Sequence, residues 1–426
     1  MNKKIIVDVQ DYQTRVAILE DEELVELYIE GEGSQRIVGN IYRGKVENVL
    51  PGMQAAFVDI GLEKNAFLYV GDINTDKSVF EFPGEQKRYG KNAKEVSIGD
   101  LISRGQEITV QVLKEPIGTK GARVTTEITL PGRYLVLMPT MDYVGVSRRI
   151  EDEFERTRLK EIGEKLKPKN MGMIIRTAAE GKDQEDFAND VDFLCRLWEG
   201  IRDKEWKGKV PRILYEDDDM IYRTIRDFYT PEVKKVIINN RQEYEKTLDF
   251  GKVLFLGLRQ RMEYYEDDSI GLFQYYGIES EIERAIKKKV WLKSGGYLII
   301  EPTEALTVID INTGKYVGTN NLEDTVLKTN LEAAKEIAHQ IRLRDIGGII
   351  IIDFIDMGKE GNRKKVQEAL MNGLKKDHTK TNILGFTGLG LMEMTRKKVR
   401  SRLSSKLLKF CPHCHGTGRV YSDLMQ

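Results

Sequence analysis

Two aspartates that follow apolar runs are the strongest candidates for chemistry in this chain. Asp310 stands near the end of the run 306–311, and Asp353 ends the run 349–353. The segment between them has a helical apolar period, so we expect a strand, a helix and a second strand in a right-handed crossover, with the strands parallel. The carboxyl ends of such strands share one sheet edge, where open sheets bind ligands. The two carboxylates are therefore expected to converge.

A divalent cation would explain this convergence, because neighbouring carboxylates repel unless a proton or a cation lies between them. Magnesium takes hard oxygen ligands and phosphates, and a bound metal polarises a phosphoryl oxygen and acidifies bound water. Asn312 lies on the strand face of Asp310, so its amide is expected to orient a carboxylate or contact a phosphate. The alternative is that Asp310 and Asp353 only cap the elements that follow them. Asp356 is expected to cap the next helix.

The sequence also contains a Cys-x-x-Cys pair, Cys411 and Cys414. Two thiolates at this spacing are half of a structural zinc site, which needs four ligands. The third cysteine, Cys195, lies far away in an expected helix, and His413 and His415 are too close to the thiolates for unstrained joint ligation. A second copy of the chain would supply the missing ligands. A redox pair is the alternative, although no thioredoxin-like context surrounds it.

Aromatic and basic residues in the first third of the chain are candidates for binding nucleic acid. Phe57 alternates with small and aliphatic residues, and Phe67 recurs on the next expected strand. Exposed aromatic side chains on a small barrel stack bases without regard to sequence. Lys45 and Lys114 are expected to meet phosphates. The alternative is that both phenylalanines belong to the barrel core.

Two basic segments also stand out, Lys287 to Lys289 and the stretch from Arg396 to Lys409. Both are candidate RNA-binding patches, and the alternative for both is a solvated helix face.

The elements that must position these residues predict an α+β multidomain protein. Strands 3–10 and 14–19 form an opening hairpin, and the short strands between 37 and 126 form a small barrel. Two helices, 154–166 and 187–198, flank a strand at 172–177. A further strand at 233–238 precedes the aspartate region. The crossover helix presents one apolar face and ends at Gly347 and Gly348; that face contains Val326, Leu327, Leu331, Ala334, Ile337, Ala338 and Ile341.

Composition limits the class of protein. With 426 residues, 40% hydrophobic and 32% charged, the chain is expected to form several ordered domains. A net charge of −1 excludes indiscriminate coating of nucleic acid, so any RNA binding must be local. Neither an export signal nor an apolar run of roughly 18 residues occurs. We expect a cytoplasmic protein with no membrane segment.

Four long strings resemble the catalytic domain of the ribonuclease E/G family. They are Val308-Ile-Asp-Ile-Asn312, Thr329-Asn-Leu-Glu-Ala-Ala334, Ile341-Arg-Leu-Arg-Asp-Ile-Gly-Gly348 and Ile352-Asp-Phe-Ile-Asp-Met357. The resemblance implies a DNase I-like catalytic subdomain in which Asp310 and Asp353 bind magnesium and Asn312 supports them. It also implies hydrolysis that leaves 5′-phosphate and 3′-hydroxyl ends.

The resemblance extends to RNA binding. Phe57, Phe67 and Lys114 fall on RNA-contact positions of the family's S1-type domain. The strings Arg133-Tyr-Leu-Val-Leu-Met-Pro139 and Ile175-Arg-Thr-Ala178 resemble its 5′ sensor.

In that sensor, an arginine and a threonine hold the terminal 5′-phosphate. Arg176 and Thr177 match them, and Gly132 and Val136 match nearby backbone positions. A guanidinium fork and a hydroxyl suit a phosphate monoester. A further arginine of the family falls on Lys380, which keeps the charge but loses the fork. Salt bridging by Arg176 is the alternative.

The architecture implied by the resemblance has five parts. Residues 1–35 and 215–285 form an RNase H-like subdomain, 36–126 an S1-type OB-fold barrel, and 127–214 the 5′-sensor region. Residues 286–407 form the catalytic domain, and 408–426 the zinc link and tail. The link shares zinc between Cys411 and Cys414 of two protomers, giving a homodimer or, by further pairing, a homotetramer.

The resulting functional prediction is an endoribonuclease acting on single-stranded RNA with Mg²⁺, stimulated by a 5′-monophosphate. The chain looks like the short ribonuclease G type, without a degradosome scaffold tail, which processes ribosomal RNA precursors and messenger RNA. One rival is a non-catalytic RNA-binding or ribosome-assembly factor. Another is a metal-dependent DNase, which the S1-type barrel disfavours.

Overall fold

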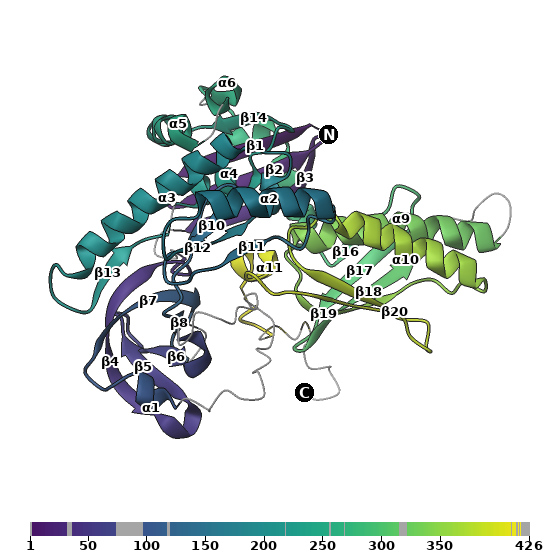
Figure 1. The fold of residues 1–426 in the computed structure, drawn as a ribbon. Helices are drawn as coiled ribbons and strands as arrows, with labels where there is room; N and C mark the ends of the chain where they lie inside the picture. The colour runs from purple at the N-terminus through teal and green to yellow at the C-terminus, as the bar shows by residue number, and fades with distance from the viewer. Residues whose placement is uncertain are drawn as a thin grey trace. The chain divides into compact units, whose positions relative to one another are not determined.

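The computed structural model describes residues 2–31, 36–73, 97–116, 120–217, 219–254, 257–267, 269–314, 322–409, 411–414, 416 and 418. It is a mixed α+β protein (Figure 1). The chain divides into two compact units. The first contains Met1–Ile29, Glu232–Tyr244 and Arg261–Gln426, and the second contains Glu30–Pro231 and Glu245–Gln260.

The first unit begins with a five-stranded sheet of order β15-β14-β1-β2-β3. Its strands are β1 (Lys3–Gln10), β2 (Gln13–Glu20), β3 (Glu23–Gly31), β14 (Val233–Ile238) and β15 (Met262–Tyr264). The expected opening hairpin is present, since β1 and β2 pair antiparallel. The expected strand 233–238 is also present and lies parallel to β1. Ile6 and Ile237 of this sheet pack with the short helices α7 (Leu272–Tyr275) and α8 (Ile278–Ala285).

A six-stranded sheet of order β16-β17-β18-β19-β21-β20 forms the rest of the first unit. Its strands are β16 (Lys289–Trp291), β17 (Tyr297–Pro302), β18 (Leu306–Asn312), β19 (Gly348–Asp353), β20 (Thr381–Phe386) and β21 (Met392–Arg396). Helices α9 (Leu322–Leu343) and α10 (Glu360–Leu374) cover one face of this sheet (Figure 1). Their apolar sides pack on Ile309, Ile350 and Ile352. The strands β18 and β19 are parallel, as the crossover predicts.

The crossover helix α9 ends earlier than predicted. Its last residue is Leu343, so Gly347 and Gly348 do not end it. Asp345 adopts a left-handed φ of 50°, a conformation that aspartate tolerates better than most residues. The Arg396 guanidinium donates to the Asp345 carboxylate at 2.7 Å and holds the turn.

The second unit contains a closed five-stranded barrel. Its strands are β4 (Ile41–Leu50), β5 (Ala55–Asp59), β6 (Ala66–Tyr69), β7 (Glu107–Lys114) and β8 (Arg123–Thr125). They follow the order β4-β5-β6-β8-β7, and β7 pairs back to β4. The pair β6 and β8 is parallel and the others are antiparallel, which is an OB-like arrangement. A later strand, β13 (Arg212–Tyr215), extends the sheet from β4.

The remainder of the second unit is a four-stranded sheet of order β11-β12-β10-β9. Its strands are β9 (Leu130–Pro131), β10 (Leu135–Met138), β11 (Val144–Val146) and β12 (Gly172–Ile175). The helices α2 (Glu153–Leu166) and α3 (Gln184–Glu205) contribute Leu159, Phe187 and Leu194 to its core. Helix α4 (Met220–Phe228) follows β13.

The α+β class and the small barrel are thus confirmed. The subdomain names, the zinc link and the domain boundaries stay predictions. Within the described ranges, no helix has the length and apolar character needed to cross a membrane.

Candidate functional site: a carboxylate pair on an open sheet face

Asp310 and Asp353 are direct register partners on the parallel strands β18 and β19. Side chains alternate along β18, so that Ile309 and Ile311 enter the core under α9 and α10 while Asp310 and Asn312 lie on the opposite face. The same alternation buries Ile352 and leaves Asp353 exposed. Adjacent strands lie about 4.8 Å apart, which brings the two carboxylates together without any further contact.

Asn312 orients one member of this pair. Its Nδ2 donates to Asp310 Oδ2 at 2.7 Å, which is one of the two roles that its position on the strand predicts. Since an amide nitrogen has a second hydrogen, Asn312 can hold the carboxylate and still offer a donor.

Neither aspartate stands at the N-cap of a helix within the described ranges. Strand β18 continues past Asp310 to Asn312, and α10 begins at Glu360 with Lys359 at its N-cap. The prediction that Asp356 caps this helix is therefore wrong. Asp356 is exposed in the turn before it.

The donor chemistry of the pair fits a magnesium ion. Neither carboxylate forms an ion pair with any described lysine or arginine, so their negative charges are not neutralised within that part of the chain. No group of three His, Cys, Asp or Glu side chains that could hold a metal occurs among the described residues. Magnesium does not require such a group, because it is commonly held by one or two carboxylates together with water and substrate phosphate.

The barrel brings three of the four predicted RNA-contact residues into one row. Phe57 pairs with Phe67, Phe67 with Arg123, and Arg123 with Lys114 on successive strands. The phenylalanine rings meet edge to face, with centroids 6.0 Å apart. Both rings are partly exposed, whereas Ala56 and Val58 fill the core, so core packing does not explain them.

Two further residues complete this barrel surface. Lys45 pairs with Asp59, two residues along β5 from Phe57, and is exposed. Arg123 had not been predicted as a contact residue. Its guanidinium bonds to Asp72 at 2.8 and 3.0 Å. Only the strand pairing, which joins β8 to both β6 and β7, places it between Phe67 and Lys114.

The predicted sensor residues gather at the ends of β10 and β12. Arg176 Nη1 donates to the Gly132 carbonyl at 2.6 Å, and its backbone N–H donates to Tyr134. Thr177 Oγ1 shares a hydrogen bond with Ser147 Oγ at 3.0 Å. Val136 pairs with Ile174, next to these contacts.

A buried carboxylate shapes the Gly132 turn. Asp190 accepts hydrogen bonds from the backbone N–H groups of Arg133, Tyr134 and Leu135. A Cβ at Gly132 would approach the Asp190 oxygens to 2.6 Å, so only glycine fits. Burial raises the pKa of Asp190 and outweighs the opposing effect of these three donors.

Asp227, at the end of α4, is the acidic partner that sequence reasoning missed. Its Oδ1 accepts from Arg176 Nη2 at 2.6 Å and from Arg226 Nε at 3.3 Å. Burial by itself raises the pKa of Asp227, but the Arg226 and Arg176 guanidinium groups outweigh burial and lower it. The salt-bridge alternative for Arg176 is thus realised, alongside its contact to Gly132.

The remaining predicted site residues are Lys380, Cys411 and Cys414. Lys380 is exposed beside β20 in the first unit, whereas Arg176 belongs to the second. Neither Cys411 nor Cys414 forms a disulfide within the described part of the chain, and the Gly418 N–H donates to Cys414 Sγ at 3.3 Å. Cys195 lies in α3, as expected. His415 lies outside the described residues.

The prediction of a basic patch between Arg396 and Lys409 is wrong in part. Arg396 is only 4% exposed, and its guanidinium contacts Asp345 and Asp377, each at 2.7 Å. Arg400 Nε lies 2.6 Å from the Asp345 carboxylate. These two arginines stabilise the fold by ion pairing. A solvated helix face does not describe them either, because Arg396 ends β21.

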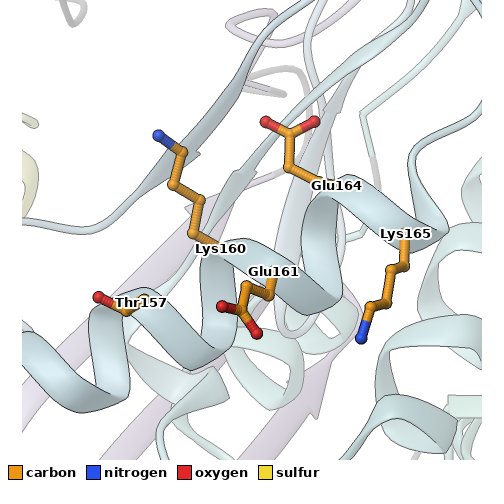
Figure 2. A pocket seen from close by; sticks show the side chains of 5 residues that line it. All are labelled: Thr157, Lys160, Glu161, Glu164 and Lys165. Carbon is orange, nitrogen blue, oxygen red and sulfur yellow. The ribbon is translucent and has the colours of Figure 1, made fainter.

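A shallow pocket on α2 is unrelated to any predicted site. Figure 2 shows its lining side chains along one exposed stretch of this helix; they are Thr157, Lys160, Glu161, Glu164 and Lys165. A depression formed by exposed side chains of a single helix offers no enclosed surface for a small ligand.

The chain is similar to a known protein family along most of its length. Residues 129–399 match the model of the Ribonuclease E/G family. The chain is 46% identical over 420 residues to "Ribonuclease G" of Salmonella typhimurium (strain SL1344), covering 99% of this chain and 85% of that protein. It is 47% identical over 417 residues to "Ribonuclease G" of Haemophilus influenzae (strain ATCC 51907 / DSM 11121 / KW20 / Rd), covering 98% and 84%.

A longer relative matches as well. "Ribonuclease E" of Nostoc sp. (strain PCC 7120 / SAG 25.82 / UTEX 2576) is 39% identical over 424 residues, covering 99% of this chain and 59% of that protein. With a family match over more than half of its residues and similarity along nearly its full length, the chain belongs to the Ribonuclease E/G family.

Proposed function

We propose that this chain hydrolyses single-stranded RNA with a magnesium ion held by Asp310 and Asp353, leaving 5′-phosphate and 3′-hydroxyl ends. The enzyme class, an endoribonuclease, follows from the family. The metal, the product ends and the residues are the proposal. The observation that carries it is the direct pairing of Asp310 with Asp353, with Asn312 bonded to the first.

Each residue has a defined task in this reaction. Asp310 and Asp353 would provide the carboxylate oxygens, and Asn312 would keep Asp310 turned toward its partner. When bound, the magnesium ion would polarise a phosphoryl oxygen of the RNA and lower the pKa of a bound water. Water adds to phosphorus, the bond from phosphorus to the 3′ oxygen breaks, and that oxygen takes a proton to become the 3′-hydroxyl.

The barrel row would hold the single strand. Bases stack on Phe57 and Phe67, while Lys114 and Lys45 meet phosphates. Stacking on aromatic side chains is independent of sequence, which suits an enzyme that must accept many RNAs. The proposed substrates are ribosomal RNA precursors and messenger RNA.

The Arg176 cluster would bind a terminal 5′-monophosphate and stimulate cleavage. Arg176 already contacts the Gly132 carbonyl and the Asp227 carboxylate, so its fork is held in one orientation. Thr177 adds a hydroxyl donor at the same turn. Lys380 would add charge without a fork, so its contribution is expected to be weaker than that of an arginine.

A cleavage assay tests the catalytic part. A 5′-monophosphorylated single-stranded oligoribonucleotide is incubated with Mg²⁺ or with EDTA, beside the matching oligodeoxyribonucleotide. We expect chelator-sensitive cleavage of RNA only. Asp310→Asn and Asp353→Asn should each abolish turnover and leave RNA affinity largely intact. Glu304→Gln is the matched control, because Glu304 is exposed in the turn that precedes β18, away from Asp310.

The outcomes separate the rival functions. Tight RNA binding without chelator-sensitive cleavage would favour a non-catalytic binding factor. A preference for DNA would favour a DNase.

We further propose that Cys411 and Cys414 share a structural zinc ion with the same pair of a second protomer. Two thiols at this spacing supply half of a tetrahedral site, and neither is in a disulfide among the described residues. Metal analysis should find about one zinc per two chains. Cys414→Ser should elute as a monomer, and an unchanged elution volume would contradict the link.

A further inference from the structure

An aromatic and cationic cluster lies on the same sheet face as the carboxylate pair. It consists of Lys289 and Trp291 on β16 and Tyr297 on β17, and we call it the Trp291 platform. Val290 and Leu292 pack into the core under the helices, so Lys289 and Trp291 lie on the opposite face. Tyr297 alternates with the buried Leu298 in the same way.

Strand register joins this platform to the catalytic residues. Trp291 pairs with Tyr297, and Tyr297 pairs with Asn312. One row along, Lys289 pairs with Ile299, Ile299 with Asp310, and Asp310 with Asp353. Two strand spacings separate β16 from β18, so the platform lies about 10 Å from the carboxylate pair across one continuous surface.

Packing of the sheet does not account for the platform. Trp291 is 62% exposed on the edge strand β16, so the sheet leaves most of its surface open to a ligand. Its ring meets Tyr297 edge to face with centroids 5.4 Å apart. The Lys289 ammonium lies 3.9 Å from the Trp291 ring centroid and 3.6 Å from that of Tyr297.

Lys289 has the charge needed for a phosphate. Lys288 pairs with Glu301 at 3.0 Å, but no carboxylate within the described residues forms an ion pair with Lys289. The basic run 287–289 therefore contributes a lysine whose cation rests on aromatic rings. An exposed cation–π contact is weaker than a base stacked on an aromatic ring, so an incoming base can displace the ammonium toward a phosphate.

We propose that the Trp291 platform is an RNA-binding subsite, in which a base of the single-stranded substrate stacks on Trp291 and Lys289 contacts a neighbouring phosphate. The occupant is a nucleotide a short distance along the strand from the one at the carboxylate pair. This inference rests on the proposed function for the location of cleavage. The stacking itself is independent of catalysis, so binding can be measured without it.

The first test measures binding in EDTA by fluorescence anisotropy with a labelled single-stranded oligoribonucleotide. We expect Trp291→Ala to weaken binding by about 5- to 100-fold and Trp291→Phe to restore most of it. Trp206→Ala is the matched control, because Trp206 is 78% exposed but lies in the other unit, and we expect unchanged affinity. Unchanged affinity of Trp291→Ala would overturn the subsite, whether or not the wild type cleaves.

The second test uses substrates with a single abasic nucleotide at successive positions. In the wild type, one position near the cleavage site should raise KM when its base is removed. Trp291→Ala should raise KM for the intact substrate with little change in kcat. In this variant, removal of the base at that one position should cause no further rise in KM. Equal sensitivity in both proteins would overturn the proposal. A changed elution volume of Trp291→Ala with unaltered abasic effects would assign the platform to contacts between protein copies instead.

Discussion

The carboxylate pair and the Arg176 cluster are positioned by different forces. Asp310, Asp353 and Asn312 lie where the strand register puts them, and the hydrogen bond from Asn312 to Asp310 joins residues two apart in sequence. Arg176 is held by Asp227 and the Gly132 turn by Asp190, through contacts between distant segments. Register is a property of backbone pattern, whereas ion pairs depend on which segments happen to meet. Sequence periodicity therefore predicts the first kind of site well and the second poorly.

The largest expected effect is on stability and concerns Arg396, which, like Arg176, is held by ion pairs between distant segments. Arg396→Ala would remove the cation that the buried Asp345 and Asp377 share, although Asp345 would keep Arg400, and should lower the free energy of unfolding by about 3–5 kcal/mol. Urea unfolding measures this, and Lys397→Ala at the exposed neighbouring position should change it by less than about 0.5 kcal/mol.

A different result would indicate that Arg396 binds RNA. If Arg396→Ala kept wild-type stability but bound RNA more weakly, the buried ion pairs would not be its role, and the predicted basic patch would stand.

The next effect concerns the sensor. Charge-assisted hydrogen bonds to a phosphate should give the wild type a roughly 10- to 100-fold higher kcat/KM for 5′-monophosphorylated than for 5′-hydroxyl RNA. Arg176→Ala should remove this preference while cleavage of the 5′-hydroxyl substrate persists. Arg196→Ala, at a surface ion pair of the same unit, should leave the preference intact. Equal rates on both substrates in the wild type would mean that Arg176 only serves the Asp227 salt bridge.

The smallest effect is a pH dependence of stability at His339. Burial lowers the pKa of His339, but bonds to Glu336 and to the Leu24 carbonyl outweigh burial, so its pKa is raised above 6.5. The protonated form therefore stabilises the fold fully below about pH 6.5, and this contribution is lost as the pH rises through the folded-state pKa. His339→Gln should lower the free energy of unfolding by less than about 1 kcal/mol at acidic pH, and by a smaller amount at alkaline pH. A stability difference that grows with pH would contradict the assignment.

The sequence predicted those features that depend on local periodicity. The hairpin of β1 and β2, the strand Val233–Ile238 and the parallel crossover to Asp353 all follow from apolar spacing and helix length. Other features depend on contacts that no local pattern encodes. β13 joins the barrel through pairing with β4, and Arg396 holds Asp345 in the turn that follows α9. The local sequence does not show the ion pairs of Arg396 with Asp345 and Asp377, so it predicted a basic surface at Arg396 instead.

Platform residues illustrate an intermediate case. Lys289 was noted for its charge, yet Trp291 and Tyr297 gained meaning only when pairing aligned them with Asn312. Alternation alone gives the face of each strand, but the register between strands fixes which residues share a row.

The most direct measurement compares kcat/KM of Asp310→Asn, Asp353→Asn and the double variant on one single-stranded RNA in Mg²⁺. If both carboxylates hold one ion, each single substitution should lower kcat/KM on the order of 1,000-fold or more. The double variant should then be about as active as the less active single variant. Near wild-type activity in either single variant, or losses that multiply in the double, would show that the two aspartates do not act on a common ion.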